Sequence, residues 1–160
     1  MRRESGFSAF EVAVTLAVVA LLASVSMPSF LRWLQVHRLR GAAINLTADL
    51  EMAKVRSIRE GAAVTVVFAE NEYTLFLDNG AGGGEAGDGI RNGAEPLVLY
   101  RQLPAGVRIV LAEMTLPDQR LSFDSRGLAP ALTSAGSIPL VNGTGERRIR
   151  VNRLGNIRSL

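Results

Sequence analysis

The chain has 160 residues, which is enough for one domain of ordinary size but not for two independent cores. Its formal net charge is +3, a slight basic excess that permits nucleic acid or anionic lipid as a partner without requiring either. It contains no cysteine, which excludes a disulfide framework, a thiolate nucleophile and any cysteine-based metal site.

The first predicted element is an apolar helix, because residues 12–31 contain no charged side chain. A helix of about twenty apolar residues crosses a hydrocarbon core of roughly 30 Å. A buried helix of a soluble domain is one alternative, but a domain of this size rarely surrounds a helix on all sides. A signal peptide is another, but its apolar region is usually only about 7–15 residues long. Arg2 and Arg3 precede the run, which places the N-terminus in the cytoplasm and the remainder across the membrane.

One carboxylate, that of Glu11, stands at the start of the apolar run. A charged group at membrane depth is costly and requires a cationic partner. Cleavage after Gly6 would supply such a partner, the new α-amine of Phe7. The carboxylate can then pair with the amine of its own chain, or with that of the next subunit, which would set the axial register of a filament. In the remaining alternative it reaches the lipid head groups unpaired.

Roughly the first thirty residues resemble the class III signal of type IV prepilins and type II secretion pseudopilins. The resemblance is carried by M-R-R-E-S-G, followed by F-S-A-F-E and an apolar helix. It implies that a prepilin peptidase cleaves between Gly6 and Phe7, and that Phe7 is then N-methylated. It also implies that Glu11 is the assembly residue, and that Pro28 loosens the helix as a proline does in many pilins. The letters S-A-F depart conservatively from the commoner T-L-I.

Helical periodicity continues beyond the membrane-spanning run, over residues 32–60. Leucine and alanine recur at steps of three and four residues, with charged side chains between them, and Gly61 supplies a stop. This pattern is typical of an amphipathic helix with one face for a partner surface. One helix is therefore predicted over about residues 7–60, bent or melted near Pro28. The apolar face consists of Leu39, Ala43, Leu46, Leu50 and Ala53.

After Gly61 the sequence is typical of short β-strands, because runs of β-branched and aromatic residues alternate with turn signals. Short strands joined by tight turns predict antiparallel sheets. The predicted strands are residues 63–69, 73–77, 96–101, 107–112, 120–123, 137–141, 147–151 and 156–159.

Most of residues 40–160 resemble the GspH/FimT family of minor pseudopilins and minor pilins. The resemblance is carried by A-K-V-R-S-I, V-x-V-x-F, Y-T-L-F-L-D, L-P-A-G-V, L-S-F-D-S-R-G and I-x-V-N-R-L-G-N-I-R, in that order. It implies an α+β, pilin-like fold, in which a long N-terminal helix, transmembrane and then amphipathic, packs on an antiparallel β-rich head of two small sheets. The expected organisation is a cleaved leader over residues 1–6, a transmembrane and assembly helix over 7–31, its amphipathic continuation over 32–60, and the head over 61–160.

The same resemblance implies a structural subunit of the type II secretion or type IV pilus machinery, which assembles at a filament tip for protein secretion. The expected partners are other pilins or pseudopilins through the N-terminal helix, the prepilin peptidase and the inner membrane. The protein is expected to cross the inner membrane once, with its N-terminus cytoplasmic and its head periplasmic, before it enters a periplasmic or surface filament. No catalytic set is found, so no enzyme activity and no cofactor are expected. His37, the only histidine, is predicted to lie on the surface near the head groups.

Residues 78–95 form the longest irregular segment and contain too many glycines for a regular element. Their side-chain oxygens are of the kind that Ca²⁺ uses, although the spacing is not that of an EF-hand. A flexible solvated loop is the alternative. A phosphate-binding loop is disfavoured because the following helix and lysine are missing. The calcium candidates are Asp78, Glu85, Asp88 and Glu95.

The C-terminal segment is rich in arginine, with no acidic residue after Glu146. Arginines at this density can neutralise phosphates without reading bases. In the FimT branch the chain end carries a G-R-x-R motif linked to DNA capture in natural transformation. Arg158 matches its second arginine, whereas Asn156 replaces the first. A FimT-like minor pilin that binds DNA for uptake is therefore one alternative, and an edge strand charged against sheet-to-sheet association is the other. The candidate residues are Arg147, Arg148, Arg150, Arg153 and Arg158.

Overall fold

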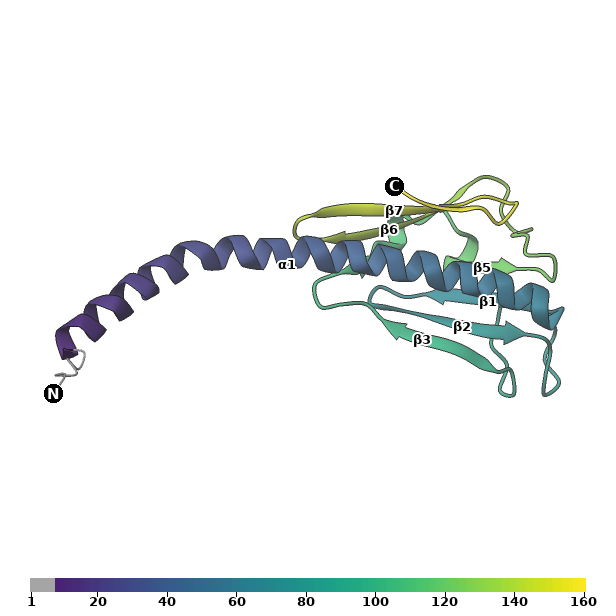
Figure 1. Cartoon of the computed structure of the whole chain (residues 1–160). Helices are drawn as coiled ribbons and strands as arrows, with labels where there is room; N and C mark the ends of the chain where they lie inside the picture. Colours follow the sequence, from purple (N-terminus) through teal and green to yellow (C-terminus); the bar gives the residue numbers. More distant parts are fainter. Residues whose placement is uncertain (1–7) are drawn as a thin grey trace. The chain divides into compact units, whose positions relative to one another are not determined.

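The structure, a computed structural model, describes residues 8–160, so the predicted cleavage site at Gly6 and Phe7 lies outside the described residues. The chain divides into two compact units, and the boundary falls between Leu34 and Gln35. Helix α1 extends over Ala9–Glu60, and the remaining elements follow it in the second unit (Figure 1).

The first unit consists of the apolar part of α1. Ser8 begins this helix as an N-cap, because its Oγ accepts the backbone N–H of Glu11 at 3.2 Å. The sequence signal for this cap is S-x-x-E, which typically marks a helix start. The helix continues through Pro28, so of the two predicted alternatives, a bent or a melted helix at this residue, the melted one is wrong. A proline removes a single intrahelical hydrogen bond, and the helical turns on either side of Pro28 are kept.

The other end of α1 follows the sequence prediction. The helix ends at Glu60, and Gly61 adopts a left-handed conformation with φ of +63°. Glycine is the usual residue at this position because it lacks the Cβ that makes a left-handed backbone costly. The glycine stop is therefore confirmed.

The first sheet of the head has the strand order β3-β2-β1-β5, and all its neighbouring strands are antiparallel. Its strands are β1 (Ala63–Phe68), β2 (Glu72–Asp78), β3 (Leu97–Gln102) and β5 (Arg120–Phe123). Strands β1 and β2 form a hairpin in which Phe68 faces Tyr73. A register shift between Leu75 and Phe76 interrupts the β2–β3 pairing.

The second sheet has the order β4-β6-β7-β8 and is also antiparallel. Its strands are β4 (Arg108–Ile109), β6 (Gly136–Asn142), β7 (Gly145–Val151) and β8 (Ile157–Ser159). Two short 3₁₀ helices, η1 (Leu111–Glu113) and η2 (Pro117–Gln119), lie between β4 and β5. Strand β8, the last yellow segment in Figure 1, is the outermost strand at its side of this sheet.

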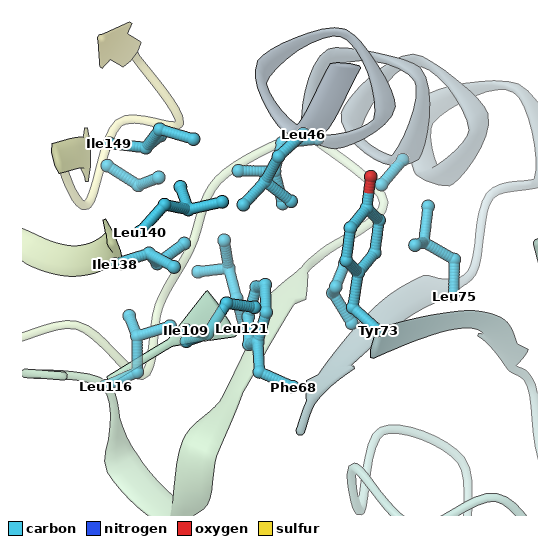
Figure 2. Packing of buried hydrophobic residues seen from close by; sticks show 14 of the residues in the cluster. Leu46, Phe68, Tyr73, Leu75, Ile109, Leu116, Leu121, Ile138, Leu140 and Ile149 are labelled. Atoms are coloured by element: carbon cyan, nitrogen blue, oxygen red, sulfur yellow. The ribbon is translucent and has the colours of Figure 1, made fainter. Parts of the chain in front are cut away.

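One hydrophobic core joins the two sheets and the head portion of α1. Leu46 of the helix is fully buried and points between the sheets. Figure 2 shows Ile138 and Ile149 of the second sheet on one side of Leu46, and Tyr73 of the first sheet on the other. The arrangement confirms the predicted α+β class, with a long N-terminal helix packed on antiparallel sheets.

The predicted strands are confirmed to within one or two residues, with one exception. The strand predicted at residues 107–112 is only Arg108–Ile109, and the chain then turns into η1. The backbone N–H of Val110 still donates to the carbonyl of Pro139 in β6 at 3.0 Å. Proline has no N–H to return this bond, so the ladder ends there.

Candidate functional site

The apolar part of α1 exposes its side chains all around the helix. Every residue from 8 to 33 is exposed, including Leu21 at 68% and Val25 at 74%. The most apolar window of this helix has a mean hydropathy of 2.1 and buries none of its residues. An apolar surface of this size marks a membrane or a protein partner. By length and composition the helix is able to cross a membrane.

Three hydroxyl groups within this segment are satisfied by the helix itself. Thr15 donates to the carbonyl of Val12 at 2.8 Å, Ser24 to that of Leu21 at 2.7 Å, and Ser26 to that of Leu22 at 2.9 Å. A polar group in hydrocarbon is costly unless it is hydrogen-bonded. These residues therefore fit an apolar environment despite their polarity.

Glu11 lies in the first turn of α1 and is exposed. No hydrogen bond or ion pair of its carboxylate is present among residues 8–160, and Phe7, the source of the predicted amine, lies outside them. An acidic residue in the first turn is favourable for the helix dipole. The position leaves the carboxylate available to a partner, and its assembly role stays a prediction.

Aromatic residues mark the other end of the apolar segment. The rings of Phe30 and Trp33 stack with centroids 5.8 Å apart. Tryptophan is typical of the membrane–water interface, because its ring is apolar and its N–H is polar. His37 follows within the next turn and is exposed.

The head portion of α1 is tied to the first sheet by a cluster around Asp49, which is 7% exposed. The hydroxyl of Tyr73 donates to Asp49 Oδ2 at 2.6 Å, and Arg101 donates through Nε at 2.6 Å and through Nη2 at 3.2 Å. Figure 2 shows the Tyr73 hydroxyl directed toward the helix. Burial, and then the hydrogen bond to Asp49, raise the pKa of Tyr73 well above its usual range. The sequence analysis missed this cluster.

Alkaline pH is expected to destabilise the head through Tyr73. In the unfolded chain this tyrosine ionises near its ordinary pKa of about 10, whereas in the folded chain it stays neutral. The free energy of unfolding is therefore unaffected by this group below about pH 10 and decreases above it. The slope approaches about 1.4 kcal/mol per pH unit. Urea unfolding of the full chain in detergent, between about pH 9 and about pH 11, measures it. Tyr73→Phe is the control, and an unchanged slope in that variant would assign the effect to other groups.

The glycine-rich segment is organised around two buried carboxylates, Asp78 and Glu95, each 1% exposed. Asp78 accepts the backbone N–H groups of Gly87 at 2.6 Å and Gly89 at 2.8 Å. Glu95 accepts those of Gly80 at 3.0 Å and of a second loop residue at 2.9 Å. The segment thus has far more internal order than its composition predicts, because carboxylates accept strong hydrogen bonds from backbone amides.

The same contacts bear on the calcium candidates. The oxygens of Asp78 and Glu95 face loop amides, and Asp88 accepts the N–H of Ile90 at 2.7 Å. Across residues 8–160, no three or more His, Cys, Asp or Glu side chains form a group suited to a metal ion. Calcium binding at Asp78, Glu85, Asp88 and Glu95 stays a prediction.

The structure separates the C-terminal arginines into different environments. Arg148 is paired with Glu146 and, at 2.7 Å, with Glu113, and these carboxylates raise its pKa. Arg150 of β7 lies directly opposite Arg158 of β8, so both guanidinium groups stand on one face of the sheet. Arg147 lies in register with the buried Leu140 and belongs to the other face. Arg153 is exposed in the turn between the two strands.

Gly155 fixes the turn that carries these strands. It has φ of +73°, and a Cβ at this position would lie 2.2 Å from the carbonyl oxygen of Gly127. Lys54 of α1 donates to its carbonyl at 2.8 Å, and the neighbouring Arg153 carbonyl accepts the N–H of Ala129 at 3.0 Å. Gly155, which corresponds to the glycine of the G-R-x-R motif, is therefore required by the backbone of this turn, independently of any ligand.

Comparisons with known proteins agree with this architecture. The family model described as type II transport protein GspH matches residues 42–155. The minor pseudopilin EpsH from the type 2 secretion system of Vibrio cholerae is similar with a TM-score of 0.56 and 14% identity, over 77% of this chain and 96% of that chain. The type IV minor pilin FimU of Pseudomonas aeruginosa is similar with a TM-score of 0.58 and 14% identity, over 79% and 90%. No curated protein matches the sequence significantly. At this identity the solved structures show a shared fold.

Proposed function

Since the chain belongs to the GspH family of type II transport proteins, we propose that it is a minor pseudopilin or minor pilin, a structural subunit of a type II secretion or type IV pilus filament. The observation that carries the proposal is the combination of two features in one chain. The family model matches residues 42–155, which include the last part of α1 and most of the head, and the helix before them exposes an apolar surface on all sides over residues 8–33. A head alone would not require such a helix.

The proposed mechanism assigns a task to each part of the chain. The apolar helix anchors the precursor in the inner membrane, with the head in the periplasm, and later packs against the helices of other pilins or pseudopilins. A prepilin peptidase cleaves between Gly6 and Phe7, and Glu11 pairs with the amine of a neighbouring subunit. The head then stands at the filament tip, where it contacts other minor subunits or the secreted protein. The role is structural and involves no catalysis.

Removing the chain from its native host tests this proposal. We expect loss of protein secretion or loss of pili, and restoration of the same phenotype by the reintroduced chain. Cross-linking of the restored chain should also recover other pilin or pseudopilin subunits. Which of the two phenotypes is lost identifies the machine. Normal secretion and normal pili in the deletion strain, together with no cross-linked pilin subunit, would contradict the proposal.

A further inference from the structure

The face formed by Arg150 and Arg158 has an unusual charge arrangement. Two like charges directly opposite each other on neighbouring strands are destabilising. Residues 8–160 offer neither guanidinium an acidic partner. Arg148, two positions earlier on the same face of β7, instead contacts two carboxylates, those of Glu146 and Glu113. The chain thus supplies carboxylates to one arginine of this face and none to the adjacent pair.

A concavity accompanies the unpaired arginines. It has a volume of about 420 Å³ and is open to solvent. Its lining combines the two guanidinium groups with two amides and apolar side chains, namely Arg150, Asn152, Asn156, Arg158, Ala135 and Leu160. The donors of arginine and asparagine suit an anionic group, and the apolar rim suits a side chain that carries this group.

The strand beside the concavity is a free edge. Within residues 8–160, strand β8 pairs with β7 alone. The backbone of Leu160 exchanges hydrogen bonds with that of Arg148, and Asn152 donates to Asn156. Because hydrogen-bonded pairs alternate along an antiparallel ladder, the backbone of Arg158 also faces β7, whereas the N–H and C=O groups of Ile157 and Ser159 face outward. These outward groups are a template for a further strand.

We propose that the edge of β8 binds an extended, acidic segment of another polypeptide as an additional antiparallel strand. The backbone of this segment pairs with Ile157 and Ser159. A glutamate or aspartate in the segment then faces Arg158 at a position where the two backbones exchange no hydrogen bond, and where opposing side chains are closest. Its carboxylate enters the concavity and neutralises Arg158 and Arg150 together.

The chemistry of this face favours a polypeptide over a nucleic acid. The free edge offers alternating N–H and C=O groups, which a strand satisfies and a phosphate backbone does not. Glu113 and Glu146, which pair with Arg148 beside the concavity, repel a continuous row of phosphates, whereas a single carboxylate at Arg150 and Arg158 avoids them. The same two arginines disfavour any strand that presents an apolar or basic residue opposite them. The edge therefore selects its partner by charge.

Binding by the purified full chain in detergent tests the proposal, and this measurement requires no filament. The probe is the peptide acetyl-Thr-Val-Glu-Val-Thr-amide, whose binding is measured by isothermal titration calorimetry, and its control carries Gln in place of Glu. We expect the glutamate peptide to bind, and the glutamine peptide to bind roughly tenfold more weakly, because the charge-assisted hydrogen bonds are lost. Absence of peptide binding at about 1 mM would overturn the proposal. Tighter binding of a DNA duplex than of the peptide would overturn it in favour of the nucleic-acid alternative.

Variants of the chain test the arginine charges and the backbone edge of β8 separately. Arg158→Gln and Arg150→Gln should each weaken peptide binding roughly tenfold, whereas Arg147→Gln, which removes the same charge from the other face of β7, should not. Ser159→Pro removes one outward N–H without changing the charge, and should weaken binding by a similar factor. Unchanged urea unfolding confirms that each variant is folded. Equal loss of binding in the Arg147 variant, or full binding by the Ser159 variant, would exclude the proposed strand.

Discussion

Replacing Glu11 with glutamine is expected to abolish incorporation of the chain into a filament and to leave the head folded. Glu11 is the one charged residue between Ser8 and Leu31, and its carboxylate is exposed. In the proposed assembly it neutralises the amine of Phe7 in a neighbouring subunit. Removing one partner of a desolvated ion pair costs about 3–5 kcal/mol, so incorporation should fall by more than a hundredfold. Immunoblotting of sheared filaments against the membrane fraction measures it.

Two companion variants make this test specific. Glu51→Gln removes the charge of another exposed glutamate on α1 and should leave incorporation unchanged. Glu11→Asp keeps the charge on a shorter side chain and should retain part of the incorporation. If Glu11→Gln enters filaments as well as the unmodified chain does, the pairing with the Phe7 amine is not what admits the subunit.

Replacing Asp49 with alanine is expected to cause a large loss of stability in the head. The change leaves the Tyr73 hydroxyl, in a side chain only 1% exposed, without its acceptor, and leaves Arg101 without its ion pair. The side chain of Arg101 is 39% exposed and can turn to solvent, so the full cost of a buried unpaired charge does not arise. We expect a loss of about 3 kcal/mol, measured as a lower urea midpoint of the full chain in detergent. Glu51→Ala on the same helix is the control and should change the midpoint little.

A double-mutant cycle separates the parts of this cluster. Tyr73→Phe alone should cost about 1 kcal/mol, because Asp49 keeps its contacts with Arg101. When Tyr73→Phe is added to Asp49→Ala, the double variant should regain roughly 1–2 kcal/mol of the unfolding free energy that Asp49→Ala alone loses. The reason is that phenylalanine leaves no buried hydroxyl unsatisfied. Strict additivity of the two substitutions would show that the tyrosine–aspartate hydrogen bond does not contribute to stability.

Features that depend on neighbouring residues in the chain were predictable from the sequence. The helix end at Gly61 and most strand bounds follow from backbone preferences and from periodicity over a few residues. The S-x-x-E pattern at Ser8 is a local signal of the same kind and predicts the N-cap that the structure shows. The strand predicted at residues 107–112 is shorter in the structure, because its length depends on Pro139 in a different strand. The sequence of residues 107–112 does not show that the residue opposite Val110 is a proline without an N–H group.

By itself, the sequence determined the apolar helix, its leading carboxylate, the change to β-strands after Gly61 and the family to which the head belongs. Each of these rests on composition or on order along the chain. Only the tertiary structure decided that Asp49 holds Tyr73 and Arg101, that Asp78 and Glu95 organise the glycine-rich segment, and that Arg150 faces Arg158 beside a free edge. These groups are far apart in sequence or depend on strand register, and a shift of one residue would turn every side chain to the opposite face. Packing of the whole head selects that register, so the function of a charged side chain here follows from its three-dimensional neighbours.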